Sequence, residues 1–69
     1  MNIDRLVRMA NDIGNFFKAE PDHVVAVDSV AAHLKHYWDP RMRKEIGAYV
    51  DCGGAELMDI VREAVLKLR

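Results

Sequence analysis

An Asp-Pro pair at positions 39 and 40 of a 69-residue chain is the feature that most restricts how this sequence folds. The residue before a proline is pushed away from the α region, so a helix that precedes the pair has to end near Trp38. Asp39 is a favourable N-cap and Pro40 suits the first position of a helix, so a second helix is expected to begin there. The sequence therefore predicts a corner between two helices near the middle of the chain.

Apolar residues recur every three or four positions in four segments, which is the spacing of helices that bury one face. These segments cover residues 3–17, the stretch from Pro21 to about Trp38, residues 40–50 and residues 55–68. Asn2 is expected to cap the first helix, and the Gly53-Gly54 pair to end the third. Because three valines weaken the early turns of the second helix, a start as late as Asp28 or Ser29 is an open alternative.

The first two segments carry the clearest apolar stripes. They consist of Ile3, Leu6, Val7, Ala10, Ile13, Gly14 and Phe17 in the first, and of Val24, Val27, Ala31, Leu34 and Trp38, flanked by Val30 and Tyr37, in the second. Phe16 extends the first stripe sideways, so the Phe16-Phe17 pair is the first candidate for exposed apolar surface. No strand pattern, repeat or low-complexity tract is found. The fold class predicted is all-α, a compact array of about four short helices, that is, a three-to-four-helix bundle.

Length and composition predict one domain, residues 1–69, with a thin core. A single core of this size rarely contributes more than ~3–5 kcal/mol, and a disulfide within the monomer is excluded because Cys52 is the only cysteine. A lone cysteine fits a reducing cytoplasm, where it acts as a small apolar residue. The apolar fraction of 51% predicts apolar surface left uncovered by packing, for which a partner protein is the natural cover.

Charge and hydropathy exclude several classes. Ten Lys and Arg residues face eleven Asp and Glu residues, which argues against a dedicated nucleic-acid binder, since its phosphate contacts need a basic stripe. No stretch approaches the ~20 apolar residues that span a bilayer, and the first residues do not form a signal peptide. We therefore expect a cytoplasmic protein with neither a nucleic-acid nor a membrane partner.

No group of residues indicates catalysis or a cofactor. His33 and His36 lie three apart with Asp39 three further on, but two histidines without a cysteine pair are a weak metal signal, and Asp39 is better explained as a cap. Cys52 lies near a helix C-terminus, whose negative dipole end disfavours a thiolate. The expectation is that this chain is not an enzyme and holds no metal or cofactor.

The corner itself has two interpretations. Tryptophan and arginine are enriched where interfaces concentrate their binding energy, so Trp38, Arg41, Met42 and Arg43 form a candidate partner-binding site. Alternatively, Trp38 is the largest residue of the core and the arginines pair with nearby acids. A nucleic-acid interface through Arg41, Arg43 and Lys44 is a further alternative, although the chain has no second basic patch to extend it.

Several strings of residues resemble a known family. They are Leu6-Val7-Arg8-Met9-Ala10-Asn11 with Phe16-Phe17, Val30-Ala31 with His33-Leu34, Trp38-Asp39-Pro40-Arg41-Met42-Arg43, and Gly53-Gly54 ahead of Leu57 and Val61-Arg62-Glu63-Ala64. Together they resemble the delta subunit of cytosolic NAD-dependent formate dehydrogenases, over nearly the whole chain. The Trp38 to Arg43 string is the most specific of them.

The resemblance implies a non-catalytic accessory subunit. Such enzymes oxidise formate to carbon dioxide with NAD as acceptor, and their larger subunits hold a molybdenum or tungsten pterin, iron–sulfur clusters and FMN. The implied partners are those larger subunits, which the chain stabilises or helps to mature. Our hypothesis is that it docks through Trp38, Arg41, Met42 and Arg43, with Arg8, Asn11 and Phe16 as a second, weaker patch. A homodimer of the isolated chain is a compatible alternative.

Overall fold

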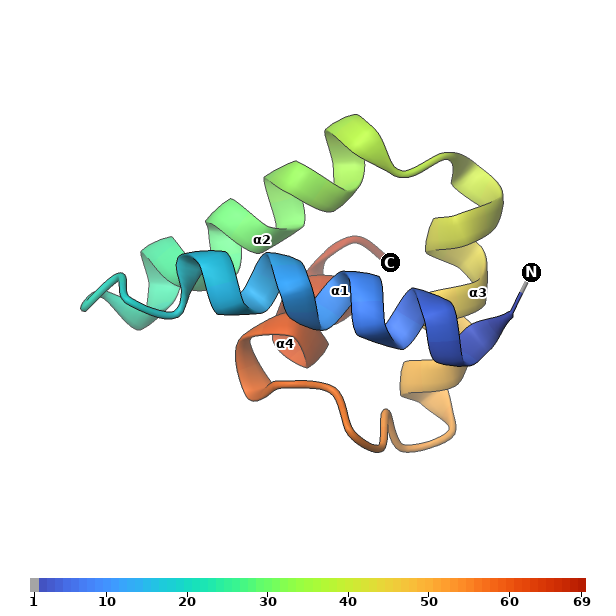
Figure 1. Ribbon diagram of the computed structural model, residues 1–69. Coiled ribbons are helices and arrows are strands. Elements are labelled where there is room, and N and C mark those ends of the chain that lie inside the picture. Colours follow the sequence, from blue (N-terminus) through green and yellow to red (C-terminus); the bar gives the residue numbers. More distant parts are fainter. Residues whose placement is uncertain (1) are drawn as a thin grey trace.

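A computed structural model describes residues 2–69, so that Met1, the first residue of the predicted domain 1–69, lies outside the described part. Four helices follow one another: α1 (Ile3–Phe17), α2 (His23–Tyr37), α3 (Pro40–Asp51) and α4 (Asp59–Lys67) (Figure 1). Residues 2–69 contain no strand. The predicted all-α array of four short helices is confirmed.

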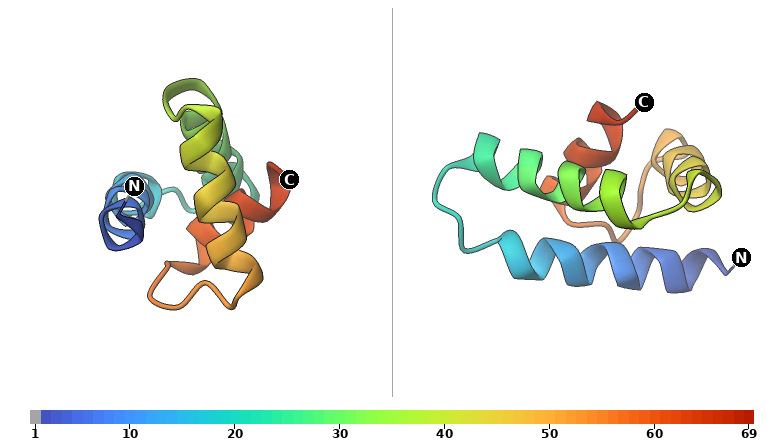
Figure 2. Two further views of the ribbon diagram at one scale, coloured as in Figure 1. Left: turned by 90° about the vertical axis from the view of Figure 1, so that its right-hand side faces the viewer. Right: turned by 90° about the horizontal axis from the view of Figure 1, so that it is seen from above.

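The helices form a hairpin with two further helices packed on it. α1 and α2 run antiparallel on either side of the loop at residues 18–22, and α3 crosses their far ends, where it is seen nearly end-on in the right view of Figure 2. α4 packs chiefly against α2 and also contacts α1 and α3. The radius of gyration is 10.7 Å. Each helix therefore touches several others, and one core lies between them.

Local capping explains most helix boundaries. Asn2 Oδ1 accepts a hydrogen bond from the backbone N–H of Asp4 (2.9 Å), and Asp39 Oδ1 accepts one from Met42 (2.9 Å), with Pro40 at the first helical position. α3 ends in a Schellman motif, in which Gly53 adopts a φ of 118°. Its N–H and that of Gly54 donate to the carbonyls of Val50 and Tyr49. These three predicted boundaries are confirmed.

The second helix begins at His23, because Asp22 caps it. The Asp22 carboxylate accepts hydrogen bonds from the N–H groups of Val24 (3.0 Å) and Val25 (3.4 Å). Pro21 thus precedes the cap instead of lying in the first turn. The alternative start at Asp28 or Ser29 is wrong, since the cap outweighs the modest cost of the β-branched residues.

The predicted start of the last helix was also wrong. α4 begins at Asp59, and residues 55–58 form an irregular segment in which Glu56 has a positive φ of 69° and Leu57 N–H donates to the Gly54 carbonyl (3.2 Å). The apolar spacing that includes Leu57 predicted a helical turn before Asp59 that does not form. Leu57 is buried, but it enters the core from this loop and not from a helix.

The core is entirely apolar among the described residues. Its buried members are Leu6, Val7, Ala10, Ala26, Val27, Val30, Ala31, Leu34, Trp38, Ile46, Val50, Leu57, Val61, Ala64 and Val65. The stripes predicted for the first two segments supply the members from α1 and, apart from Ala26, those from α2 and Trp38. Val24 was expected in the seam of the second helix but is exposed. Tyr37, expected beside that seam, is exposed as well.

Candidate docking surfaces

Trp38, predicted as the aromatic anchor of a docking corner, lies in the core. Only 6% of its surface is exposed, and its side chain belongs to the same buried cluster as Leu34 and Ile46. Its backbone N–H donates to the Leu34 carbonyl and closes α2. The structure therefore favours the core interpretation of Trp38 over the interface interpretation. An exposed anchor at this corner has to come from other residues.

The three other residues of the corner differ in their surroundings. Arg41 is exposed, whereas Met42 is half-buried and packs against the core. Arg43 is half-buried too, and its guanidinium Nη1 donates a long hydrogen bond (3.5 Å) to the Lys35 carbonyl at the end of α2. Of the predicted corner, Arg41 and Arg43 thus remain available to a partner.

The three residues of the second predicted patch also differ in their surroundings. Asn11 uses its side-chain amide inside the chain, donating from Nδ2 to the Glu56 carbonyl (2.8 Å) and accepting at Oδ1 from the Met58 N–H (3.0 Å). Arg8 is exposed on the same helix. Phe16 is 78% exposed, as its place at the edge of the stripe predicted. Asn11 therefore holds the loop before α4 in place, and of the predicted patch only Arg8 and Phe16 are exposed on the surface.

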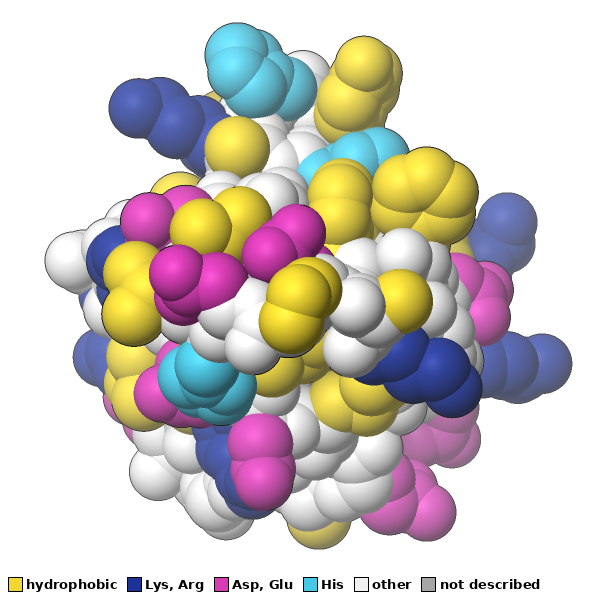
Figure 3. Space-filling view, turned by 90° about the vertical axis from the view of Figure 1, so that its left-hand side faces the viewer, with side chains coloured by type: hydrophobic (Ala, Val, Ile, Leu, Met, Phe, Trp, Pro, Cys, Tyr) yellow, Lys and Arg dark blue, Asp and Glu magenta, His cyan; other side chains and the backbone are white. Residues whose placement is uncertain are grey.

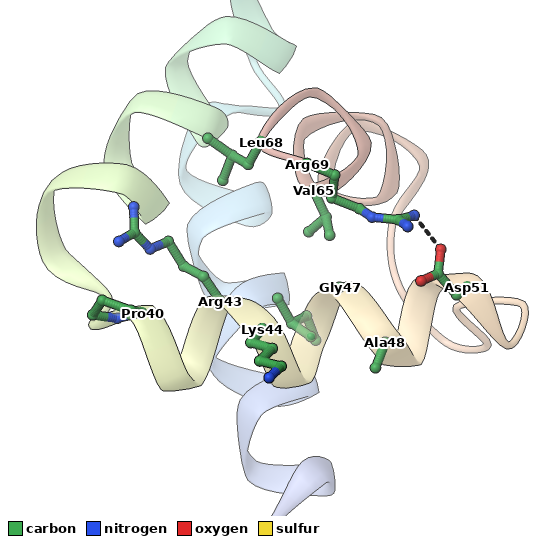
Figure 4. A pocket seen from close by; sticks show the side chains of 10 residues that line it. Pro40, Arg43, Lys44, Gly47, Ala48, Asp51, Val65, Leu68 and Arg69 are labelled. Atoms are coloured by element: carbon green, nitrogen blue, oxygen red, sulfur yellow. Dashed lines mark hydrogen bonds and ion pairs between the residues drawn. The ribbon is translucent and has the colours of Figure 1, made fainter.

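The largest groove that we describe, the α3–α4 groove, lies beside this corner. Its volume is about 610 Å³, and Figure 4 shows that one face of α3 forms one wall and the end of α4 the other (Figure 4). The lining residues are Pro40, Arg43, Lys44, Ile46, Gly47, Ala48, Asp51, Val65, Leu68 and Arg69. The α3 members repeat at helical spacing, so they share one side of that helix. This groove joins segments about twenty residues apart in the sequence.

Charges line this groove unevenly. Arg43, Lys44 and Arg69 contribute three cations, while Asp51 contributes one acid, which pairs with the Arg69 guanidinium. Both members of that pair remain about half exposed. The groove is therefore locally positive although the chain as a whole has a formal charge of -1. The sequence alone did not indicate Arg69 as a site residue, since only the packing of α4 on α3 brings it to the corner.

A second surface, the aromatic ridge, runs from the end of α1 to the end of α2. The Phe16 and Phe17 rings meet edge to face at 4.9 Å, Phe17 lies 6.3 Å from the His33 ring, and His33 lies 4.6 Å from the Tyr37 ring. Phe16 and Tyr37 are 78% and 75% exposed. Figure 3 shows hydrophobic and histidine side chains close together on the upper part of one face of the molecule (Figure 3). The exposure of two large rings is typical of a surface that a partner covers.

A third surface, the α2–α4 strip, contains exposed apolar residues between ion pairs. Val24 and Leu66 are exposed there beside buried Val27. His23 Nε2 contacts Glu63 Oε2 at 2.6 Å, and Lys67 pairs with Asp28, so that two contacts connect the helices across the strip. Because all four side chains are about half exposed, each pair contributes little to stability.

The candidate metal and thiol residues show no assembled site. His33 lies in the aromatic ridge, and the part of the chain from residue 2 onward contains no group of three His, Cys, Asp or Glu side chains placed to hold a metal ion. Cys52 is exposed at the end of α3, so the expectation that it acts as apolar filler was wrong. Among the described helices, none is long and apolar enough to cross a bilayer.

Together, the fold and these surfaces define a class: a small all-α domain with a wholly apolar core that presents exposed aromatic rings and a basic groove, features that are typical of subunit interfaces. Comparison with known families makes the class specific. The chain belongs to the family of NADH-dependent formate dehydrogenase delta subunits, FdsD, which matches residues 5–65. No curated protein and no solved structure matches the chain. The resemblance inferred from the sequence is confirmed.

Proposed function

We propose that this chain is a non-catalytic, cytoplasmic accessory subunit of a NAD-dependent formate dehydrogenase. It binds the larger subunits of the enzyme and stabilises the complex or assists its maturation with the molybdenum cofactor. Formate oxidation, the molybdenum pterin, the iron–sulfur clusters, FMN and NAD are assigned to those larger subunits. The observation that carries the proposal is the family match over residues 5–65, which makes the chain a delta subunit.

Exposed apolar side chains support a binding role. Phe16 and Tyr37 leave most of their rings in water, although a chain of this length has few large apolar residues to spare. Removing apolar surface from water contributes about 25 cal/mol for each Å² buried, so covering these rings favours association. Tyrosine and phenylalanine are also enriched in the buried centres of interfaces.

Because the core is thin, docking is also expected to stabilise the fold of the chain itself. A ligand that binds only the folded state stabilises it by mass action, and a larger subunit acts as such a ligand for a small domain. The isolated chain is therefore less stable than the docked chain. Docking also buries the complementary surface of the larger subunit, which protects that surface from non-specific association.

Co-purification from the native cytoplasm tests the binding role. A tagged chain is expected to recover the larger formate dehydrogenase subunits, and the recovered complex is expected to oxidise formate with NAD. Deleting the chain is expected to lower either the yield of the assembled enzyme or its molybdenum content. An enzyme that assembles with full molybdenum and activity without the chain, and never co-purifies with it, contradicts the proposal.

The same experiment separates the two accessory roles. If the chain stabilises the complex, it remains in the finished enzyme at a fixed ratio, and adding purified chain to the depleted enzyme restores its half-life. If it assists maturation, it is recovered mainly with cofactor-free larger subunits, and adding it to the depleted enzyme restores nothing unless a molybdenum cofactor source is present.

A further inference from the structure

We propose that the α3–α4 groove binds an acidic segment of a larger subunit, in which carboxylates flank an apolar side chain. This inference rests on the proposed function, because the occupant is taken to be a larger subunit. It specifies which face of the delta subunit docks and the chemistry of the segment that it receives.

The groove has an apolar floor, and its volume of about 610 Å³ is large enough to admit a side chain of a partner. Ile46 and Val65 are buried at its base and Leu68 is half-buried. Gly47 lies at the middle of α3, where glycine costs roughly 1 kcal/mol relative to alanine. A Cβ at Gly47 would meet only the side chain of Arg69, at 3.8 Å, which is an ordinary contact. Packing within the chain therefore does not require a glycine there, and its presence keeps the floor hollow.

The charges of the groove determine the chemistry of the occupant. Arg43, Lys44 and Arg69 line the groove, and the exposed Arg41 lies one turn before Lys44 on α3. Asp51, the one acid among the lining residues, pairs with Arg69. A segment with carboxylates is complementary to this surface, and arginine binds carboxylates bidentately.

The Arg69–Asp51 pair does not close the groove to such a segment. Both side chains are about half exposed, and ion pairs of this kind contribute little net free energy. A carboxylate of the partner can therefore take the place of Asp51 at the Arg69 guanidinium at small cost. The aliphatic part of Arg69, which lies over Gly47, then forms one side of a pocket for the apolar side chain of the occupant.

A protein segment fits the groove better than a nucleic acid does. Phosphates would meet the same cations, but the floor formed by Ile46, Val65 and Leu68 offers them no hydrogen-bond donors, whereas it suits the apolar side chain of a protein segment. The formal charge of the whole chain, -1, also lacks the excess of cations that a polyanion partner requires. Binding of nucleic acid at the groove in place of a protein segment would overturn the inference.

Matched charge reversals test the groove in the full-length chain. Lys44→Glu places an acid in the groove, and Arg5→Glu makes the same change of charge at an exposed position of α1 outside it. Both positions are exposed, so both variants are expected to keep the wild-type helicity by circular dichroism. We expect Lys44→Glu to weaken binding to the purified larger subunits about tenfold or more and Arg5→Glu less than about twofold, because like charges across an interface repel.

Hydrogen exchange on the assembled complex gives an independent readout. Protection upon docking is expected at residues 43–51 and 65–69, and raising the salt concentration is expected to weaken wild-type binding but to affect the Lys44→Glu variant less. Protection confined to other elements, together with equal affinity of both variants, would overturn the groove assignment and leave the accessory function intact. If the wild-type chain binds no larger subunit, the proposed function fails as well. Retardation of DNA or RNA at physiological salt that Lys44→Glu abolishes, without an effect on subunit binding, also overturns it.

Discussion

A Cβ atom added to Gly14 in α1 would lie 2.6 Å from Cγ2 of Val61 in α4. It would also lie 2.8 Å from the sulfur of Met58. Real Cβ atoms do not approach carbon or sulfur so closely, and Val61 is fully buried, so its β-branched side chain has little room to move. Gly14 therefore lets α1 and α4 pack in close contact, which no side chain at this position allows.

Replacing Gly14 with alanine is expected to destabilise the fold. The extra methyl group forces α1 and α4 apart and costs ~1–3 kcal/mol by overpacking, which exceeds the gain of roughly 1 kcal/mol from the better helix former. Urea unfolding followed by circular dichroism should therefore show a lower free energy of unfolding for Gly14→Ala. A stability equal to or above that of the wild type would show that the two helices do not pack as described.

Gly47→Ala is the matched control, since it makes the same substitution in α3. Its Cβ meets nothing closer than the Arg69 side chain at 3.8 Å, so only the helix propensity changes. Unfolding is expected to cost about 0.5–1 kcal/mol more than in the wild type. Opposite signs for the two glycine variants are the result that the packing predicts.

Asn11→Ala is expected to loosen the segment before α4. The variant loses the hydrogen bonds to the Glu56 carbonyl and the Met58 N–H, and the free energy of unfolding should fall by ~1–3 kcal/mol. Exchange of the Met58 amide hydrogen, followed by NMR, should become faster. Asn15→Ala, at an exposed position one turn later, serves as the control and should change stability by less than about 0.5 kcal/mol.

Trp38→Ala is expected to unfold most of the protein. Removing a buried tryptophan side chain costs about 3–5 kcal/mol, which is comparable with what a core of this size contributes in total. Thermal unfolding should show a strongly reduced transition, whereas Trp38→Phe should retain a cooperative one. A Trp38→Ala variant that folds as well as the wild type but loses its partner would restore the interface interpretation. Arg41→Ala, which removes an exposed side chain, is the better probe of the corner.

The double variant Phe16→Ser, Tyr37→Ser is expected to reduce self-association without unfolding the chain. Both rings are mostly exposed, so the change in stability should be near 0.5 kcal/mol or below. If the isolated chain forms the homodimer named above as an alternative, and does so through the aromatic ridge, sedimentation velocity is expected to show concentration-dependent dimers for the wild type and monomers for the variant. Phe17→Ser is the contrasting variant, because Phe17 packs against the core and its loss should lower stability. Equal association of wild type and double variant would rule out the aromatic ridge as the self-association surface.

Capping residues made three helix ends predictable from the sequence alone, the start of α1 and both ends of α3. Asn2, Asp39 and the Gly53-Gly54 pair act through backbone groups within a few residues, so their effects can be read locally. The spacing of apolar residues gave the face of α1 for the same reason, since a helix places residues three and four apart on one side. The family, too, was recognisable from short strings of residues and is confirmed by the match over residues 5–65.

The start of α4 depended on residues far away in the chain. Asn11 binds the backbone of residues 56 and 58 from α1, forty-five or more positions earlier, and local periodicity carries no trace of that contact. The polypeptide there follows an irregular path because its backbone groups are satisfied by a side chain of another helix. The spacing of apolar residues therefore predicted a helical turn at residues 55–58 that does not form.

The sequence by itself determined where helices form, which faces are apolar and to which family the chain belongs, because these depend on neighbours within about four residues and on short strings. Only the tertiary structure decided that Trp38 is buried while Tyr37 and Val24 are exposed, and that Arg69 and Lys44 line one groove. Those outcomes depend on which helix faces which. The crossing of α3 over the hairpin and the close contact at Gly14 set that arrangement, and both arise from packing between distant segments.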